Sequence, residues 1–170
     1  MTRLRLMLLS LLAFLLGAAL PAQAAVVVSF YSHDFGDRFP HAFVTLKGRV
    51  DATGEAVDTN YGFTAKSVSP AILFGSVKGY VQTSKPDYVA KSDRQFSLTV
   101  DDATYARLLA KIGEWQNREQ PSYSLGKHNC VHFVMELAEA LGLKVNRKSK
   151  YFKKPKSFLQ EVKGLNPQLE

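Results

Sequence analysis

Cys130 is the single cysteine of the chain, and it lies in the sequence Lys-His-Asn-Cys-Val-His-Phe at residues 127–133. Asn129 is a favourable N-cap, which would place Cys130 in the first turn of a helix. Unpaired N–H groups and the helix dipole stabilise an anion there, so we expect the pKa of the thiol to fall and the thiolate to serve as a nucleophile. The same N–H groups could form part of an oxyanion hole. The alternative is a buried structural cysteine, because free cysteines are among the most buried residues.

A thiol nucleophile needs a general base, and the chain offers His33, His41, His128 and His132. His132 follows Cys130 by two residues, about 200° further round the helix, so its side chain is expected to point away. His33 lies in a polar loop, and the loop that holds His128 does not determine its direction. His41 opens an apolar strand, where a rigid sheet can aim the imidazole at a helix terminus. His41 is therefore the best candidate base, and the alternative for it is a structural role at a strand end.

A catalytic histidine also needs a polar partner that orients its second ring nitrogen. If the strand at residues 42–46 pairs with residues 59–63, Asn60 comes opposite His41. Asp58 shares a face with Asn60, because side chains alternate along a strand. We therefore take Asn60 as the first candidate for the third catalytic residue and Asp58 as the reserve.

Two hydrophobic periods predict the elements that must position these residues. Apolar, β-branched runs predict strands at 26–31, 41–46, 56–63, 79–82 and 95–100, the second and third forming a hairpin around a turn at 47–54. A change to helical spacing predicts a helix that carries Tyr105 to Trp115, with Asp101 or Thr99 as its N-cap. A last short helix is expected to start at Pro155. The expected fold is one α+β domain, an antiparallel sheet packed against helices.

The helix that starts at Cys130 has the clearest pattern, and Gly142 is a natural stop for it. Its apolar residues recur at helical intervals, so that the thiol begins the face turned towards the sheet: Cys130, Phe133, Val134, Leu137, Ala138 and Leu141. The same geometry sends the side chains of His128, Cys130 and His132 in different directions. Their spacing matches no strong zinc motif, so we expect no metal and no cofactor.

Residues 1–24 have the pattern of a secretory signal: a basic start, an apolar run and a small-x-small cleavage site before Ala25. We therefore expect a mature domain at 25–170, in the periplasm or outside the cell. An unpaired thiol in such an oxidising compartment must be buried or used. Loss of Arg3 and Arg5 with the signal would lower the net charge from +7 to +5.

Much of the remaining positive charge lies in a run that begins at Arg147 and ends at Lys156. Such a run could bind an anionic surface of the cell envelope, such as a polymer or lipid headgroups. The alternative is a solvated loop before the last helix. We expect no nucleic-acid partner.

The pattern of residues resembles that of circularly permuted papain-like proteins, which include relatives of the NlpC-type cell-wall peptidases and the lecithin–retinol acyltransferase-like group. The sequence His-Ala-Phe-Val at 41–44 matches the histidine strand of that family. The sequence Asn-Cys-Val-His-Phe-Val at 129–134 is close to the acyltransferase-like Asn-Cys-Glu-His-Phe-Val, with Val131 in place of the glutamate. The resemblance implies Cys130 as nucleophile, His41 as base and a polar third member, for which Asn60 is the likeliest match.

By this resemblance we expect an exported cysteine hydrolase, an amidase or peptidase that forms an acyl-enzyme. Export makes a peptidoglycan peptide the first substrate to consider and a lipid ester the second, with acyl transfer or esterase activity. The alternative from another class is a non-catalytic envelope-binding module of the same fold. A third alternative is a redox or intermolecular-disulfide role for Cys130.

Overall fold

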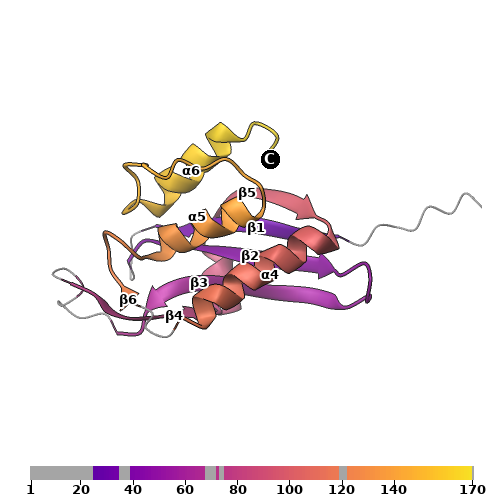
Figure 1. Cartoon of the computed structure of the whole chain (residues 1–170), viewed down its shortest axis with the longest axis horizontal. Helices are drawn as coiled ribbons and strands as arrows, with labels where there is room; N and C mark the ends of the chain where they lie inside the picture. The colour runs from indigo at the N-terminus through magenta and orange to yellow at the C-terminus, as the bar shows by residue number, and fades with distance from the viewer. Residues whose placement is uncertain (1–24, 35–38, 68–71, 73–74, 119–121, 170) are drawn as a thin grey trace, which may run out of the picture.

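The computed structural model describes residues 25–34, 39–67, 72, 75–118 and 122–169. The expected signal at residues 1–24 lies outside this part. Within the described residues, six antiparallel strands form one sheet in the order β5-β1-β2-β3-β4-β6 (Figure 1). They are β1 (Val26–His33), β2 (His41–Arg49), β3 (Ala56–Ala65), β4 (Val77–Gln82), β5 (Asp93–Val100) and β6 (Ser122–Tyr123).

Three helices cover one face of this sheet, namely α4 (Asp102–Gln116), α5 (Cys130–Ala140) and α6 (Pro155–Leu165). Helix α5 packs over β2 and β3, α4 contacts β4 and α5, and α6 packs over β1 and β5. A short helix, α3 (Pro86–Ala90), follows β4. The predicted α+β fold, an antiparallel sheet against helices in a single domain, is therefore confirmed.

Local signals in the sequence explain where the helices begin and end. The Asp101 carboxylate accepts a hydrogen bond of 2.8 Å from the Thr104 N–H, which confirms Asp101 as the N-cap of α4. The chain leaves α5 through Gly142, whose φ of +78° favours glycine. Strand β6 was not predicted, because its two residues lie in a stretch that reads as a polar loop.

The hydrophobic core lies between the helices and the sheet. It includes Ala42, Val44 and Leu46 of β2, all fully buried. Alternation turns His41 and Phe43 to the opposite face, where Tyr88 of α3 contacts the Phe43 ring with centroids 5.7 Å apart. The first residues of β2 thus present side chains to both sides of the sheet.

Strands β2 and β3 separate at the end of the sheet where β2 begins. They pair from Arg49 opposite Ala56 to Val44 opposite Tyr61, and β3 then continues by pairing with β4 from Gly62 onwards. The backbone of the first residues of β2 is therefore unpaired on the β3 side. The N-terminus of α5 lies at this same end (Figure 1).

Candidate functional site

A cavity of about 700 Å³ opens at the end of the sheet where β2 and β3 separate. Cys130, the first residue of α5, lines it together with His41, the first residue of β2. Tyr123 and Asn129 contribute from the segment that leads into α5. The structure thus brings the predicted nucleophile and the predicted base to one cavity, although they are 89 positions apart in the sequence.

The Cys130 thiol is buried, with 3% of the residue exposed, and burial raises its pKa to about 11. Hydrogen bonds from the Ala42 backbone N–H and the Tyr123 hydroxyl oppose this rise only in part. The Ala42 N–H can face the sulfur because β3 does not pair with it. Our expectation of a lowered thiol pKa is therefore wrong for the resting site, because desolvation outweighs the effect of the helix terminus.

Asn129 fixes the start of α5, as its predicted role of N-cap requires. Its Oδ1 accepts hydrogen bonds from the N–H groups of Val131 (2.8 Å) and His132 (3.3 Å). Its Nδ2 donates to the carbonyl oxygens of Leu125 (2.7 Å) and Phe152 (2.8 Å), so that one buried amide joins three segments around the cavity. The cap occupies two of the first-turn N–H groups, which restricts the predicted oxyanion hole.

His41 is buried, and its Nε2 has no hydrogen-bond partner within the part of the chain that the structure describes. The ring lies against Gly62 of β3, where a Cβ would come 2.6 Å from Nε2. Burial, with a smaller contribution from the neighbouring His33, lowers the pKa of the imidazole from 6.5 to about 4. His41 is therefore neutral at physiological pH.

The predicted third catalytic residue is not beside His41. The hairpin register places Asn60 opposite Thr45, and continuing that register puts Thr64 opposite His41. The cause is the turn, which lies at residues 50–55 and is closed by Gly54 with a φ of +70°, later than the expected 47–54. Asn60 instead binds the backbone of Ser84, through Oδ1 at 2.6 Å and Nδ2 at 3.1 Å.

The reserve candidate, Asp58, is further still from the cavity. It lies opposite Lys47 and forms an exposed ion pair with its Nζ at 3.5 Å. Neither candidate can orient the His41 ring in this arrangement.

Cys130 and His41 reach the cavity from the two sides of the β2 terminus. The thiol belongs to the helix side, where it meets Ala42, while His41 lies on the Phe43 side. Nε2 of His41 has no hydrogen-bond partner among the described residues, so it is not bonded to the sulfur. With pKa values of about 11 and about 4, both groups are neutral at rest.

His132 and His33 each have contacts of their own in the fold. His132 Nδ1 lies 3.4 Å from the Asn129 backbone nitrogen, which completes a capping box, and its ring stacks on Phe152 at 4.5 Å. His33 hydrogen-bonds Ser92 at 3.0 Å and stacks on Tyr88 at 4.3 Å. Both side chains are thus engaged elsewhere, and the choice of His41 as the base stays a prediction.

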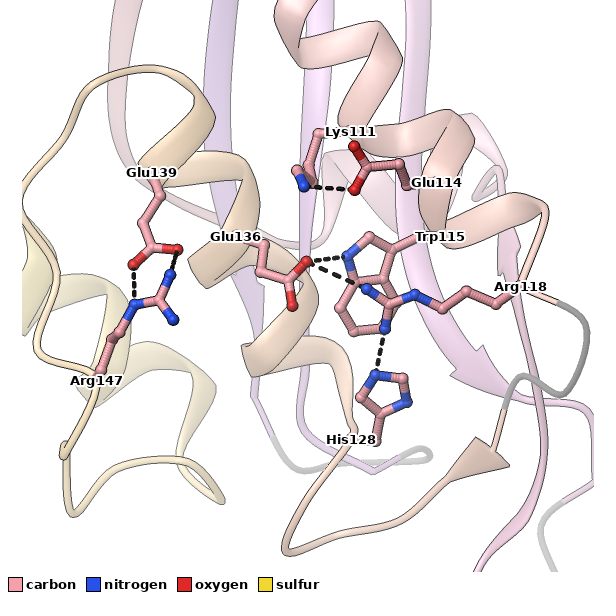
Figure 2. Close-up of polar contacts among 8 residues, drawn as sticks. All are labelled: Lys111, Glu114, Trp115, Arg118, His128, Glu136, Glu139 and Arg147. Carbon is pink, nitrogen blue, oxygen red and sulfur yellow. Dashed lines mark hydrogen bonds and ion pairs between the residues drawn. The ribbon is translucent and has the colours of Figure 1, made fainter.

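His128 belongs to a cluster that the sequence did not indicate (Figure 2). Its ring stacks on Trp115 at 4.6 Å and contacts Arg118, whose guanidinium lies 3.8 Å from the centre of the Trp115 ring. Glu136 of α5 accepts hydrogen bonds from the Trp115 indole (2.8 Å) and from Arg118 (3.2 Å). The cluster fastens the segment before Cys130 to both α4 and α5. The sequence could not indicate this cluster, because its residues come together only when α4 packs against α5.

Two further properties of the described residues bear on function. They contain no group of three or more histidine, cysteine, aspartate or glutamate side chains arranged to hold a metal ion. They also contain no helix that is long and apolar enough to cross a membrane.

Comparisons of the chain with protein-family models, with curated proteins and with solved structures found no match.

Proposed function

We propose that the protein is an exported thiol hydrolase, in which Cys130 attacks an amide or ester carbonyl and forms an acyl-enzyme. The observation that carries this proposal is the cavity itself, which unites a cysteine at a helix N-terminus with a histidine at a strand start. Circularly permuted papain-like enzymes use the same two positions, and this chain resembles them in its Asn-Cys-x-His-Phe-Val and His-Ala-Phe-Val sequences.

Because both groups are neutral at rest, the proton must leave the sulfur as the new bond forms. His41 accepts that proton while the Cys130 sulfur bonds to the carbonyl carbon. The imidazolium then gives the proton to the leaving amine or alkoxide as the carbon–nitrogen or carbon–oxygen bond breaks. Water then gives a proton to His41 as its oxygen bonds to the thioester carbon; the carbon–sulfur bond breaks, the acid is released, and the imidazolium returns the proton to the Cys130 sulfur. This general-base route needs no preformed ion pair.

Two backbone N–H groups could stabilise the oxyanion. Val131 and His132 donate to the Asn129 cap, which leaves the N–H of Cys130 itself in the first turn. The second donor is the Ala42 N–H, which is unpaired on the β3 side and faces the sulfur. Donors that are held in place before the reaction stabilise developing charge without reorganisation.

The proposed compartment follows from the signal-like residues 1–24, and the first proposed substrate is a peptide amide of the cell wall. A lipid ester is the second. Both ends of the basic run are neutralised within the protein, because Arg147 binds Glu139 (2.6 Å) and Lys156 binds Asp34 and Asp93 (both 2.9 Å).

The test of the proposed function is turnover of peptide p-nitroanilides and N-acyl p-nitrophenyl esters by the wild type, Cys130→Ala and Cys130→Ser. The wild type should hydrolyse at least one ester with a burst, and both variants should lose the burst. Cys130→Ser is the matched control, because it keeps the size and hydrogen bonding of the side chain but not the thiol. Full activity in Cys130→Ala would refute the proposal.

One observation favours a non-catalytic binding module instead. The buried thiol has a raised pKa, and Nε2 of the proposed base has no partner among the described residues. In such a module Cys130 would be a core residue, and small peptides or lipids would bind in the cavity without reacting. Saturable ligand binding that is equal in wild type and Cys130→Ala, without any burst, would identify the binding module.

A further inference from the structure

Among the described residues that line the cavity, the charged side chains are of one sign. Among its described lining residues, Lys85 and Lys153 are the only charged side chains apart from the titratable His41 and Cys130, and no carboxylate is present. Both lysines are exposed, and neither forms an ion pair within the described residues. The acidic residue nearest to Lys85 in sequence, Asp87, does not line the cavity.

Lys153 is held beside the start of α5. The preceding residue, Phe152, gives its carbonyl oxygen to Asn129 Nδ2 at 2.8 Å and stacks its ring on His132 at 4.5 Å. The following residue, Lys154, donates its N–H to the Tyr151 carbonyl at 2.8 Å. The backbone of Lys153 is thus fixed by the same amide that caps the Cys130 helix.

The backbone around Lys85 is held in a similar way. The backbone of Ser84 is bound at both its N–H and its carbonyl oxygen by the Asn60 amide. The Lys85 carbonyl oxygen accepts hydrogen bonds from Tyr88 (3.0 Å) and Val89 (3.2 Å) of α3. Asn60, expected to orient His41, instead fixes this rim of the cavity.

We propose that Lys85 and Lys153 form an anion subsite that selects acyl substrates bearing a carboxylate near the scissile carbonyl, as in a short acidic peptide. Two cations on fixed backbone segments lower the potential energy of an anion in a concave site whose described lining holds no carboxylate. A short peptide suits the place, because the lysines line a concavity with polar groups such as Gln82 and Thr83. A membrane surface would instead require cations on a flat or protruding face.

This inference rests on the proposed function in one respect: that the bound anion belongs to a substrate whose carbonyl reacts with Cys130. The attraction of the two lysines for an anion does not depend on it. Its first test therefore needs no turnover. Iodoacetate and iodoacetamide alkylate the same thiolate and differ in one charge, so the ratio of their rates with Cys130 reports the potential at the thiol. The fraction of thiolate cancels in this ratio. A short neutral peptide with one cysteine provides the reference ratio.

The wild type should react with iodoacetate at a relative rate above the reference. The double variant Lys85→Ala/Lys153→Ala should lower this ratio roughly threefold to tenfold at low ionic strength, and high salt should have the same effect on the wild type. The matched control is Lys163→Ala, an exposed lysine of α6 outside the cavity, which should leave the ratio unchanged. A wild-type ratio at the reference value would overturn the subsite.

A second arm identifies the anion. Short peptides that differ only in glutamate or glutamine should protect Cys130 from iodoacetamide unequally, with the glutamate peptide stronger in wild type and the difference lost in the double variant. Protection by phosphatidylglycerol vesicles with none by the acidic peptide would overturn the peptide assignment.

The two proposals fail separately. A raised ratio without any acyl-enzyme would retain the subsite and refute the hydrolase. Equal rates of Cys130 acylation by matched glutamate and glutamine esters would refute the subsite and retain the hydrolase.

Discussion

Lowering the pH from 7 to 4 is expected to remove about 3 kcal/mol of folding free energy through His41 alone. In the unfolded chain this imidazole binds its proton near the ordinary pKa of 6.5, whereas burial and His33 lower the pKa in the folded protein to about 4. The unfolded state therefore binds more protons between these values. The folding free energy that the neutral His41 contributes is fully present above pH 6.5 and falls as the pH approaches 4. Below pH 4 this contribution changes little.

The assay is urea denaturation followed by circular dichroism at pH 7, 5.5 and 4, on the wild type and His41→Gln. Glutamine fills a similar volume and does not titrate, so the variant should lose about 3 kcal/mol less over this range than the wild type does. The readout is the difference between pH values, which does not depend on how stable each protein is at pH 7. His33→Gln is the second variant, because removing His33 should reduce the loss slightly.

Equal losses in the wild type and His41→Gln would refute this reasoning. They would mean that the imidazole is hydrated in solution. The premise that the thiol and the imidazole are both neutral at rest would then also be refuted. A larger loss in His41→Gln would contradict the sign of the linkage itself.

Three other changes probe the site. Gly62→Ala places a Cβ 2.6 Å from His41 Nε2, so the ring must move; we expect a loss of about 1–3 kcal/mol in urea denaturation and slower acylation. Asn129→Ala removes the four hydrogen bonds that this buried amide makes with backbone groups and should cost about 2–4 kcal/mol by the same assay, with Asn129→Asp intermediate because it keeps the cap. The rate of Cys130 alkylation should rise about tenfold per pH unit up to a pKa near 11, and a plateau by pH 8 would contradict the buried thiol.

Local signals predicted the parts of the site that depend on neighbouring residues. Asn129 caps α5 and Cys130 begins its buried face, because N-cap chemistry and helical spacing are properties of a few consecutive residues. The start of β2 at His41 was predicted correctly for the same reason.

Properties that depend on distant parts of the chain were not accessible in this way. The position of the hairpin turn sets the register of β2 and β3, so a later turn moved Asn60 four places away from His41. The burial that raises the thiol pKa comes from packing of the whole domain, and Tyr123 meets Cys130 only because β6 joins the sheet edge.

The most direct test of the account is the rate at which Cys130 is acylated with and without its proposed base. Wild type and His41→Gln are mixed with a p-nitrophenyl ester, quenched at intervals and analysed by intact-protein and peptide mass spectrometry. We predict one acyl group on Cys130 in the wild type and acylation about 10²–10⁴-fold slower in His41→Gln. Equal rates in the two proteins, or acyl groups on lysines alone, would contradict the pairing of this thiol with this histidine.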